Sequence, residues 1–444
     1  MNQLALFLPC AAGVQDYLLP EVLQITGLNA SEAVKQRGGV QVQASWRDAM
    51  KLNLYNRLSQ RVLVQLSHTQ YRSEQDLYRA ASEVAWEIWF TPRQSIKIEV
   101  TAQHSPLTSL NFAALKVKDA VCDRFRDKAG GIRPDVDTRW PDIRIYAHLT
   151  TDTCTLYIDT SGEPLFKRGW REDKGDAPLK ETLAAAMIAA SGWPEALQAA
   201  ERAGTPLPPL YDPCCGSGTI AIEAAQIACG IAPGLLRHFA FEKMLPFQPH
   251  VWSAIKKEAE NSINVRPGIV FGSDVAHRMV DFAQRNADRA GVAACVEFRG
   301  GDALQRMPPT AQAGVMLLNP PYGERIAVAG FSGMAGGSNA SRGGQGSPSD
   351  DDEGDEPAQP GRFGAREVAH TDDGGDFFLQ LASHWKKNYS GWTAWMLTPD
   401  LKMPGKMRLK ESRKVPMWNG PIECRLFKFD MVAGRMAKSG SDHR

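Results

Sequence analysis

The residues whose types and spacing most clearly suit a chemical reaction are Asn319-Pro320-Pro321-Tyr322, which follow the apolar run 315–318. Asn319 offers a side-chain oxygen that can accept one hydrogen of an amine, and the carbonyl of Pro320 can accept the other. The prolines fix the backbone, and Tyr322 can stack against a flat base or amide. This chemistry suits a planar, weakly basic amine that loses a proton as it receives a methyl group. A proline turn that ends a buried strand would explain the same residues without chemistry.

A glycine-rich segment upstream is the second feature that points to group transfer. It reads Asp212-Pro213-Cys214-Cys215-Gly216-Ser217-Gly218. Glycines let the backbone pass close to a ligand, and a helix expected at 219–229 would point its N-terminus there. Residues 216–221 also fit the Gly-x-Gly-x-x-Ala pattern of dinucleotide-binding loops. A pyrophosphate has no use for the anionic Asp212 at the mouth of the loop, so we favour a ligand with a cationic amino group.

Polar residues end four successive strands that the hydrophobic pattern predicts: Asp212, Asp274, Asp302 and Asn319. Strands and helices alternate along this region, which predicts an α/β fold with a doubly wound, mostly parallel sheet. Ligands of such sheets lie across the carboxyl ends of the strands. Asp212 could accept from a cationic amino group, Asp274 from ribose hydroxyls and Asp302 from an adenine amine. That set fits S-adenosylmethionine, although Asp274 and Asp302 could instead be plain helix N-caps.

The predicted cofactor residues come from the glycine loop and the strand ends, and no metal ligand is predicted. They are Asp212, Pro213, Cys214, Gly216, Ser217, Gly218, Asp274, Asp302 and Asn319. The predicted catalytic residues are Asn319, Pro320, Pro321 and Tyr322.

Length, charge and cysteine usage bound the remaining possibilities. A chain of 444 residues suits two to three domains, and no apolar run approaches the roughly 20 residues of a membrane span. None of its eight cysteines forms a Cys-x-x-Cys pair, so we expect free thiols and a cytoplasmic location. Residues 326–375 carry 3 basic and 9 acidic side chains, whereas residues 376–444 carry 13 and 6. The basic C-terminal region could neutralise phosphates, or it could be a solvated surface.

Together these segments resemble the THUMP-domain class I RNA methyltransferases, and most closely the ribosomal large-subunit (23S) guanine-N2 methyltransferases. The likeness rests on Asp-Pro-Cys-Cys-Gly-Ser-Gly-Thr with Ile-Glu-Ala-Ala (222–225), and on Leu-Leu-Asn-Pro-Pro-Tyr-Gly-Glu-Arg (317–325). Further similar segments are 57–63, 118–125, 178–185 and 419–425. Some relatives carry a second methyltransferase domain at the C-terminus, and this chain ends before one could form.

The resemblance implies a Rossmann-like catalytic domain behind an RNA-binding region. Residues 1–165 would be a ferredoxin-like plus THUMP region that grips RNA, and residues 166–192 a linker with the first catalytic helix. Residues 193–432 would be the methyltransferase domain, and residues 433–444 a flexible tail. Glycine, serine and acidic residues dominate 330–375, so we expect a disordered insertion that departs from the family and stays away from bound RNA.

The implied reaction is methylation of a guanine N2 in 23S rRNA or its precursor particle. The guanine would be flipped onto Tyr322, Asn319 and the Pro320 carbonyl would orient its amine, and the methyl would be transferred in line. A tRNA guanine-N2 methyltransferase, a DNA adenine-N6 methyltransferase and a glutamine-N5 methyltransferase of release factors remain alternatives. A non-catalytic RNA-binding ribosome assembly factor is a further alternative.

Overall fold

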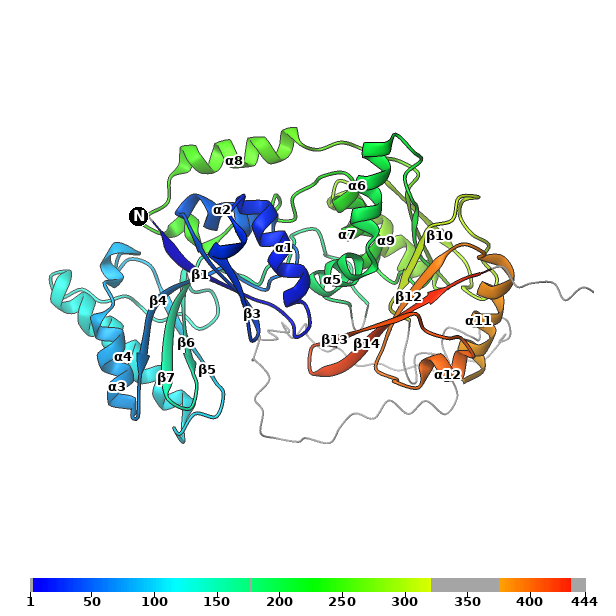
Figure 1. The fold of residues 1–444 in the computed structure, drawn as a ribbon. Coiled ribbons are helices and arrows are strands. Elements are labelled where there is room, and N and C mark those ends of the chain that lie inside the picture. Colours follow the sequence, from blue (N-terminus) through cyan, green and yellow to red (C-terminus); the bar gives the residue numbers. More distant parts are fainter. Residues whose placement is uncertain (1–2, 176–177, 321–374, 433–444) are drawn as a thin grey trace, which may run out of the picture. The chain divides into compact units, whose positions relative to one another are not determined.

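The computed structural model describes residues 3–175, 178–320 and 375–432, which belong to two compact units (Figure 1). The larger unit contains the described residues 3–64, 159–320 and 375–432, and the smaller contains 65–158. The predicted insertion at 330–375, except for its last residue, and the predicted tail at 433–444 lie outside the described residues. Within the described ranges, no helix is long and apolar enough to cross a bilayer.

The larger unit begins with a β-α-β-β-α-β arrangement. Strand β1 pairs antiparallel with β3 and, through Leu6 and Val64, with β4. Alternate side chains of β1 are buried, as expected for a strand with one face on the core. The apolar pattern of the sequence predicts a strand at 4–8 and helices at 13–23 and 48–57, and the structure confirms these three elements. The pattern does not predict β2 and β3. The elements are β1 (Leu4–Pro9), α1 (Gln15–Thr26), β2 (Ala33–Gln36), β3 (Gly39–Ala44), α2 (Trp46–Tyr55) and β4 (Leu63–Gln70).

The smaller unit packs two helices on a mixed sheet. Strands β5 and β6 are parallel, β6 and β7 are antiparallel, and β7 lies next to β4. Helices α3 and α4 pack together, and the ring of Phe125 lies 4.9 Å from that of Phe90. The sequence pattern predicts helices at 75–86 and 111–128 and strands at 95–101, 143–149 and 154–160, and the structure confirms them. They are α3 (Glu74–Glu83), β5 (Ile96–Ala102), α4 (Leu110–Lys128), β6 (Ile143–Leu149) and β7 (Thr153–Asp159).

The rest of the larger unit is built on a seven-stranded sheet with the order β10-β9-β8-β11-β12-β14-β13. The first five strands are parallel, and β14 runs antiparallel to both of its neighbours. This confirms the doubly wound, mostly parallel sheet that the sequence predicted. The strands are β8 (Leu210–Asp212), β9 (Val270–Asp274), β10 (Val296–Gly300), β11 (Val315–Leu318), β12 (Thr393–Thr398), β13 (Arg413–Asn419) and β14 (Ile422–Asp430).

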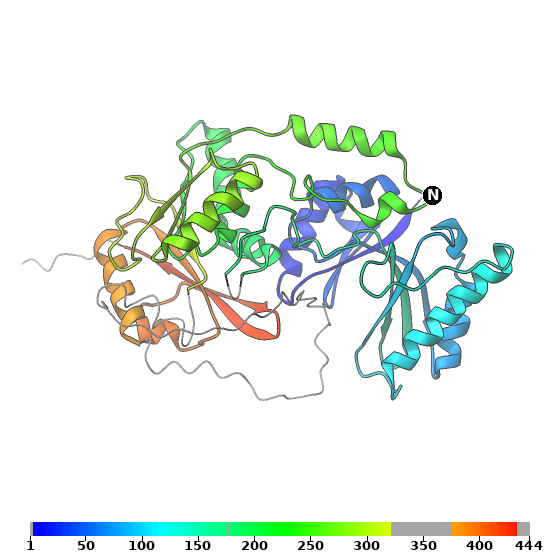
Figure 2. The ribbon, with the colours of Figure 1, turned by 180° about the vertical axis from the view of Figure 1, so that it is seen from behind.

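Helices cover this sheet (Figures 1 and 2). A buried cluster joins α11 and α12 to the sheet through residues such as Met316, Trp385 and Phe427. Helix α5 packs on α7 and β11, and α7 packs on β8 and β9. These helices are α5 (Glu181–Ser191), α6 (Trp193–Ala203), α7 (Thr219–Ala228), α9 (His277–Arg289), α11 (Gly375–Asn388) and α12 (Met403–Met407). Helix α8 (Pro249–Asn261) packs on α2 instead (Figure 1).

Candidate active site

The structure brings the four predicted strand-end residues to one edge of the sheet. Asp212 and Asp274 are the last residues of β8 and β9. Asn319 directly follows β11, and Asp302 follows β10 by two residues. Because β10, β9, β8 and β11 are adjacent and parallel, their carboxyl ends share this edge. The thiol of Cys214 reflects their closeness, because burial and the charges of the three aspartates together raise its pKa.

Carboxylates from two neighbouring strands hold the backbone of the glycine loop. Oδ1 of Asp212 accepts a hydrogen bond from the N–H of Cys214 at 3.1 Å. Oδ2 of Asp274 accepts one from the N–H of Gly216 at 2.9 Å. Both carboxylates therefore hold the backbone of this loop in place. Asp274 is thus more than a helix cap.

Gly218 precedes α7 in a conformation that only glycine adopts easily, with φ of +91°. A Cβ atom placed there would lie 3.0 Å from the Cβ of Ala283, 3.1 Å from Ile222 and 3.1 Å from Phe298. The loop consequently passes in close contact with α9 and β10. This close packing explains why glycine is required at position 218.

The carboxyl group of Asp212 is held in an environment that disfavours its charge. Its residue is 1% exposed, and burial, assisted by the charge of Asp274, raises its pKa to about 8. The hydrogen bond from Cys214 opposes this shift. Among the described residues, Asp212 forms no ion pair. A buried acid in this state favours a cationic group brought next to it, since the opposite charge offsets the cost of burying the carboxylate.

Arg171 supports the loop from behind, and sequence reasoning gave it no role. Its guanidinium donates to the hydroxyls of Ser217 at 3.1 Å and Thr219 at 2.7 Å. It also pairs with Glu181, at the start of α5, at 2.7 Å. Burial raises the pKa of Glu181, and the charge of Arg171 counters that effect. Arg171 thus joins the linker, the glycine loop and α5.

A second buried ion-pair group attaches the first 64 residues to α7. Glu223 is fully buried within α7, and its carboxylate receives Arg168 at 3.0 Å and Arg57 at 3.3 Å. The guanidinium of Arg168 also donates to the carbonyl of Arg57 at 2.8 Å. This network fixes the helix that begins at the glycine loop against the N-terminal part of the same unit.

The four predicted catalytic residues are described only in part. Asn319 is half-buried and Pro320 is buried, immediately beyond the strand that neighbours β8. Pro321 and Tyr322 lie outside the described residues. The first two residues therefore stand beside the glycine loop's own strand. An acceptor at this position can reach a ligand that occupies the same edge.

Three protein-family models match consecutive parts of the chain. The RlmL ferredoxin-like domain matches residues 5–63, and the THUMP domain matches residues 71–159. The RMKL-like methyltransferase domain matches residues 168–331, which include the glycine loop and Asn319-Pro320-Pro321-Tyr322. The order of the three matches follows the order of the regions that the sequence predicted.

Curated relatives extend the similarity over nearly the whole chain. A protein of Psychromonas ingrahamii, named "Ribosomal RNA large subunit methyltransferase K/L", is 33% identical over 440 residues, or 98% of this chain and 51% of its own. A protein of the same name from Shewanella amazonensis is 34% identical and covers 92% of this chain and 51% of its own. The chain thus spans about half the length of the curated relatives it matches.

Solved structures share the fold from end to end. The crystal structure of SMU.472 complexed with SAH is 24% identical, with a TM-score of 0.76, and the match covers 98% of this chain and 100% of that one. A possible methylase from Clostridium difficile 630 is 25% identical, with a TM-score of 0.76 and the same coverage. These likenesses show that the arrangement of elements described above recurs in other proteins.

Proposed function

We propose that this chain, which matches the RlmL ferredoxin-like, THUMP and RMKL-like methyltransferase domain models in turn, transfers a methyl group from S-adenosylmethionine to the N2 amine of a guanine in 23S rRNA. The observation that carries this proposal is the meeting of Asp212, Asp274 and Asn319 beside the glycine loop. The names of the curated relatives support large-subunit RNA as the substrate. The SAH in SMU.472, which has the same fold, supports the cofactor.

The residues at the edge of the sheet fit this cofactor by charge and by hydrogen bonding. S-adenosylmethionine supplies a methyl group on a cationic sulfonium and also carries a protonated amino group. Asp212, buried without a cationic partner among the described residues, would accept from that amino group. Asp274 would accept from the ribose hydroxyls and Asp302 from the adenine amine. The loop itself would lie against the cofactor through Pro213, Cys214, Gly216, Ser217 and Gly218.

The target amine would be positioned by the residues that follow β11. The side-chain oxygen of Asn319 would accept one hydrogen of the guanine N2, and the carbonyl of Pro320 the other. Tyr322 would support the flipped base by stacking, with Pro321 holding the turn. Positioning the N2 lone pair in line with the methyl would supply most of the rate enhancement.

The remaining assignments follow from the same proposal. Residues 1–165 would hold the RNA, and residues 166–192 would lead into the methyltransferase domain at 193–432. We also propose a cytoplasmic location, where the eight free cysteines would stay reduced. Deleting 332–372 would leave RNA binding intact if the acidic insertion is a tolerated surface loop.

The test is transfer of a tritiated methyl group from S-adenosylmethionine to unmodified 23S rRNA, tRNA and plasmid DNA in parallel reactions. Label in 23S rRNA alone is the expected result. Label in tRNA or in DNA would replace the proposed substrate by one of the alternatives. Absence of label from all three, with S-adenosylmethionine bound, would favour a non-catalytic RNA-binding factor.

A further inference from the structure

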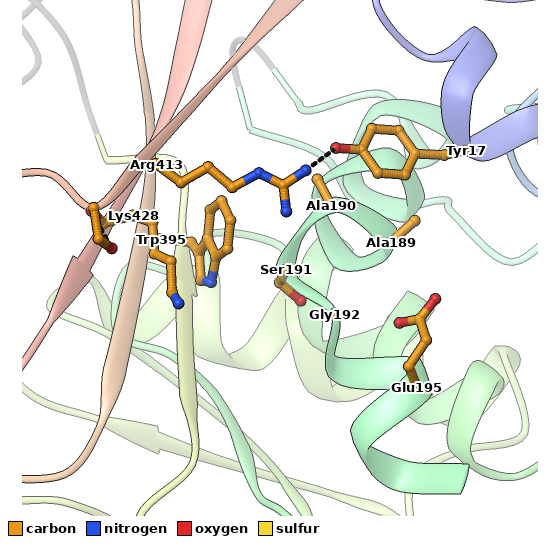
Figure 3. A pocket seen from close by; sticks show the side chains of 10 residues that line it. Tyr17, Ala189, Ala190, Ser191, Gly192, Glu195, Trp395, Arg413 and Lys428 are labelled. Carbon is orange, nitrogen blue, oxygen red and sulfur yellow. Dashed lines mark hydrogen bonds between the residues drawn. The ribbon is translucent and has the colours of Figure 1, made fainter. Parts of the chain in front are cut away.

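A pocket of about 430 Å³ lies in the larger unit, at the end of α5 that is far from the glycine loop. Figure 3 shows that α1, the turn between α5 and α6, and strands β12 to β14 contribute its side chains. Its polar and aromatic lining comprises Tyr17, Glu195, Trp395, Ser412, Arg413 and Lys428. The volume is within the range of small-molecule sites and exceeds what a single ion needs.

Two positive charges face each other across neighbouring strands of this pocket. Arg413 of β13 and Lys428 of β14 are directly opposite in the antiparallel register, so their side chains share one face of the sheet. Like charges in this arrangement destabilise a sheet unless something neutralises them. Lys428 pairs with Asp430 at 3.2 Å, but Arg413 forms no ion pair within the described residues. An anion bound at the guanidinium of Arg413 would relieve the repulsion.

Two hydroxyl groups of the lining add to the guanidinium of Arg413. The guanidinium donates to the hydroxyl of Tyr17 at 3.5 Å, and Ser412 contributes a second hydroxyl. An oxygen-rich anion is the kind of group that accepts hydrogen bonds from several such donors at once.

The opposite wall of the pocket carries one acceptor. Glu195 lies in the first turn of α6, and no described side chain forms an ion pair with it. A carboxylate there would repel an anion but would accept a hydrogen bond from a hydroxyl or an amine. The pocket therefore calls for a ligand that joins an anionic group to a hydroxyl or amine donor. A ribonucleotide has both, since its phosphate stands near a 2′-hydroxyl.

The pocket is separate from the candidate active site. Arg171 and Glu181 join the glycine loop at the first residue of α5, whereas Ser191, at the last residue, lines the pocket. A helix of 11 residues is about 16 Å long. A strand of RNA whose target base lies beside Asn319, at the same edge of the sheet as the glycine loop, could reach this pocket with a flanking nucleotide.

We propose that this pocket binds one ribonucleotide of the substrate strand, with Arg413 and Lys428 on its phosphate and Glu195 on its 2′-hydroxyl. The proposal rests on the proposed function only for the source of the nucleotide, which is RNA. The same lining would accept a free ribonucleoside monophosphate, so the two sources must be compared directly.

The test measures binding of a fluorescein-labelled RNA of 12 nucleotides, and of the DNA of the same sequence, to the full chain by anisotropy over a series of salt concentrations. Arg413→Gln is compared with Lys414→Gln, which removes a charge from the next residue of β13 on the opposite face. We expect Arg413→Gln to weaken RNA binding about tenfold and to lower the salt slope by about one, with a change of less than about twofold for Lys414→Gln. Glu195→Gln should reduce the preference for RNA over DNA.

Adenosine 5′-monophosphate serves as the free competitor, and binding of SAH reports that each variant is folded. Equal losses in Arg413→Gln and Lys414→Gln, or no loss in either, would overturn the pocket while leaving the proposed methyltransferase function intact. Arg413-dependent binding of the monophosphate with unchanged RNA affinity would overturn RNA as the source. Failure of the unaltered chain to bind any RNA would overturn this proposal and the RNA substrate together.

Discussion

Replacing Asp212 by asparagine should damage the proposed cofactor site. The variant should nevertheless become more stable relative to the parent as the pH rises, because the parent loses stability and the variant does not. In the folded chain burial raises the pKa of this carboxyl to about 8, whereas an unfolded aspartate titrates near the ordinary value of 3.8. Between these two values the folded state holds a proton that the unfolded state has released. The free energy of unfolding contributed by Asp212 is therefore largest below about pH 4 and is lost as the pH rises toward 8.

The size of this effect follows from the same shift. Each pH unit inside the window removes about 1.4 kcal/mol, so the interval from pH 5 to pH 8 removes on the order of 4 kcal/mol. Asparagine does not titrate, and its side-chain oxygen can still accept from the N–H of Cys214. The buried amide hydrogens of asparagine would lack acceptors, which lowers the free energy of unfolding by about 1–3 kcal/mol, but this loss does not vary with pH. The variant should gain on the parent across the interval.

Urea unfolding at pH 5 and pH 8, followed by tryptophan fluorescence, measures this difference. Asp281→Asn makes the same chemical change at an exposed position of α9 and is the matched control. A difference between Asp212→Asn and parent that stays constant from pH 5 to pH 8 would refute the reasoning. It would mean that Asp212 is already ionised in the folded chain.

Three further predictions use the same site. Affinity for S-adenosylmethionine should fall by up to about tenfold per pH unit as the pH drops from about 8 to 6, because Asp212 must lose its proton to hold a cation. Calorimetry in buffers of different ionisation enthalpy would detect the released proton. Gly218→Ala should lower the melting temperature and the affinity for SAH, because positive φ alone costs about 1–2 kcal/mol; unchanged values would contradict the close packing. Glu223→Gln should destabilise the chain by about 3–5 kcal/mol in urea, because it leaves Arg168 buried without its anion; a loss below about 1 kcal/mol would show that the ion pair is replaceable.

The sequence could predict the edge of the sheet where the candidate site lies, because local patterns determine it. Asp212, Asp274 and Asn319 each end an apolar run, and the rule that parallel strands share one carboxyl edge brings them together without knowledge of the packing. Helix α8 was missed although Trp252, Ile255 and Ala259 are buried at helical spacing, so here the signal was available in the sequence.

Other features depend on contacts that no local pattern encodes. Strand β13 contains Pro416 and only two buried residues, and it is stabilised by pairing with β14 at the edge of the sheet. Arg171 acquires its role from hydroxyls 46 and 48 residues away in the chain. Arg413 meets Tyr17 across 396 residues. Such long-range neighbours are set by tertiary packing, so sequence reasoning could not find the contacts of Arg171 or the pocket beside Arg413.

The central claim is tested most directly by nucleoside mass spectrometry of unmodified 23S rRNA after incubation with the chain and S-adenosylmethionine. The proposal predicts N2-methylguanosine with the unaltered chain, and none with Asn319→Ala, which should still bind SAH. Methylation at another atom, or undiminished N2-methylguanosine with Asn319→Ala, would contradict the roles given to the residues that follow β11.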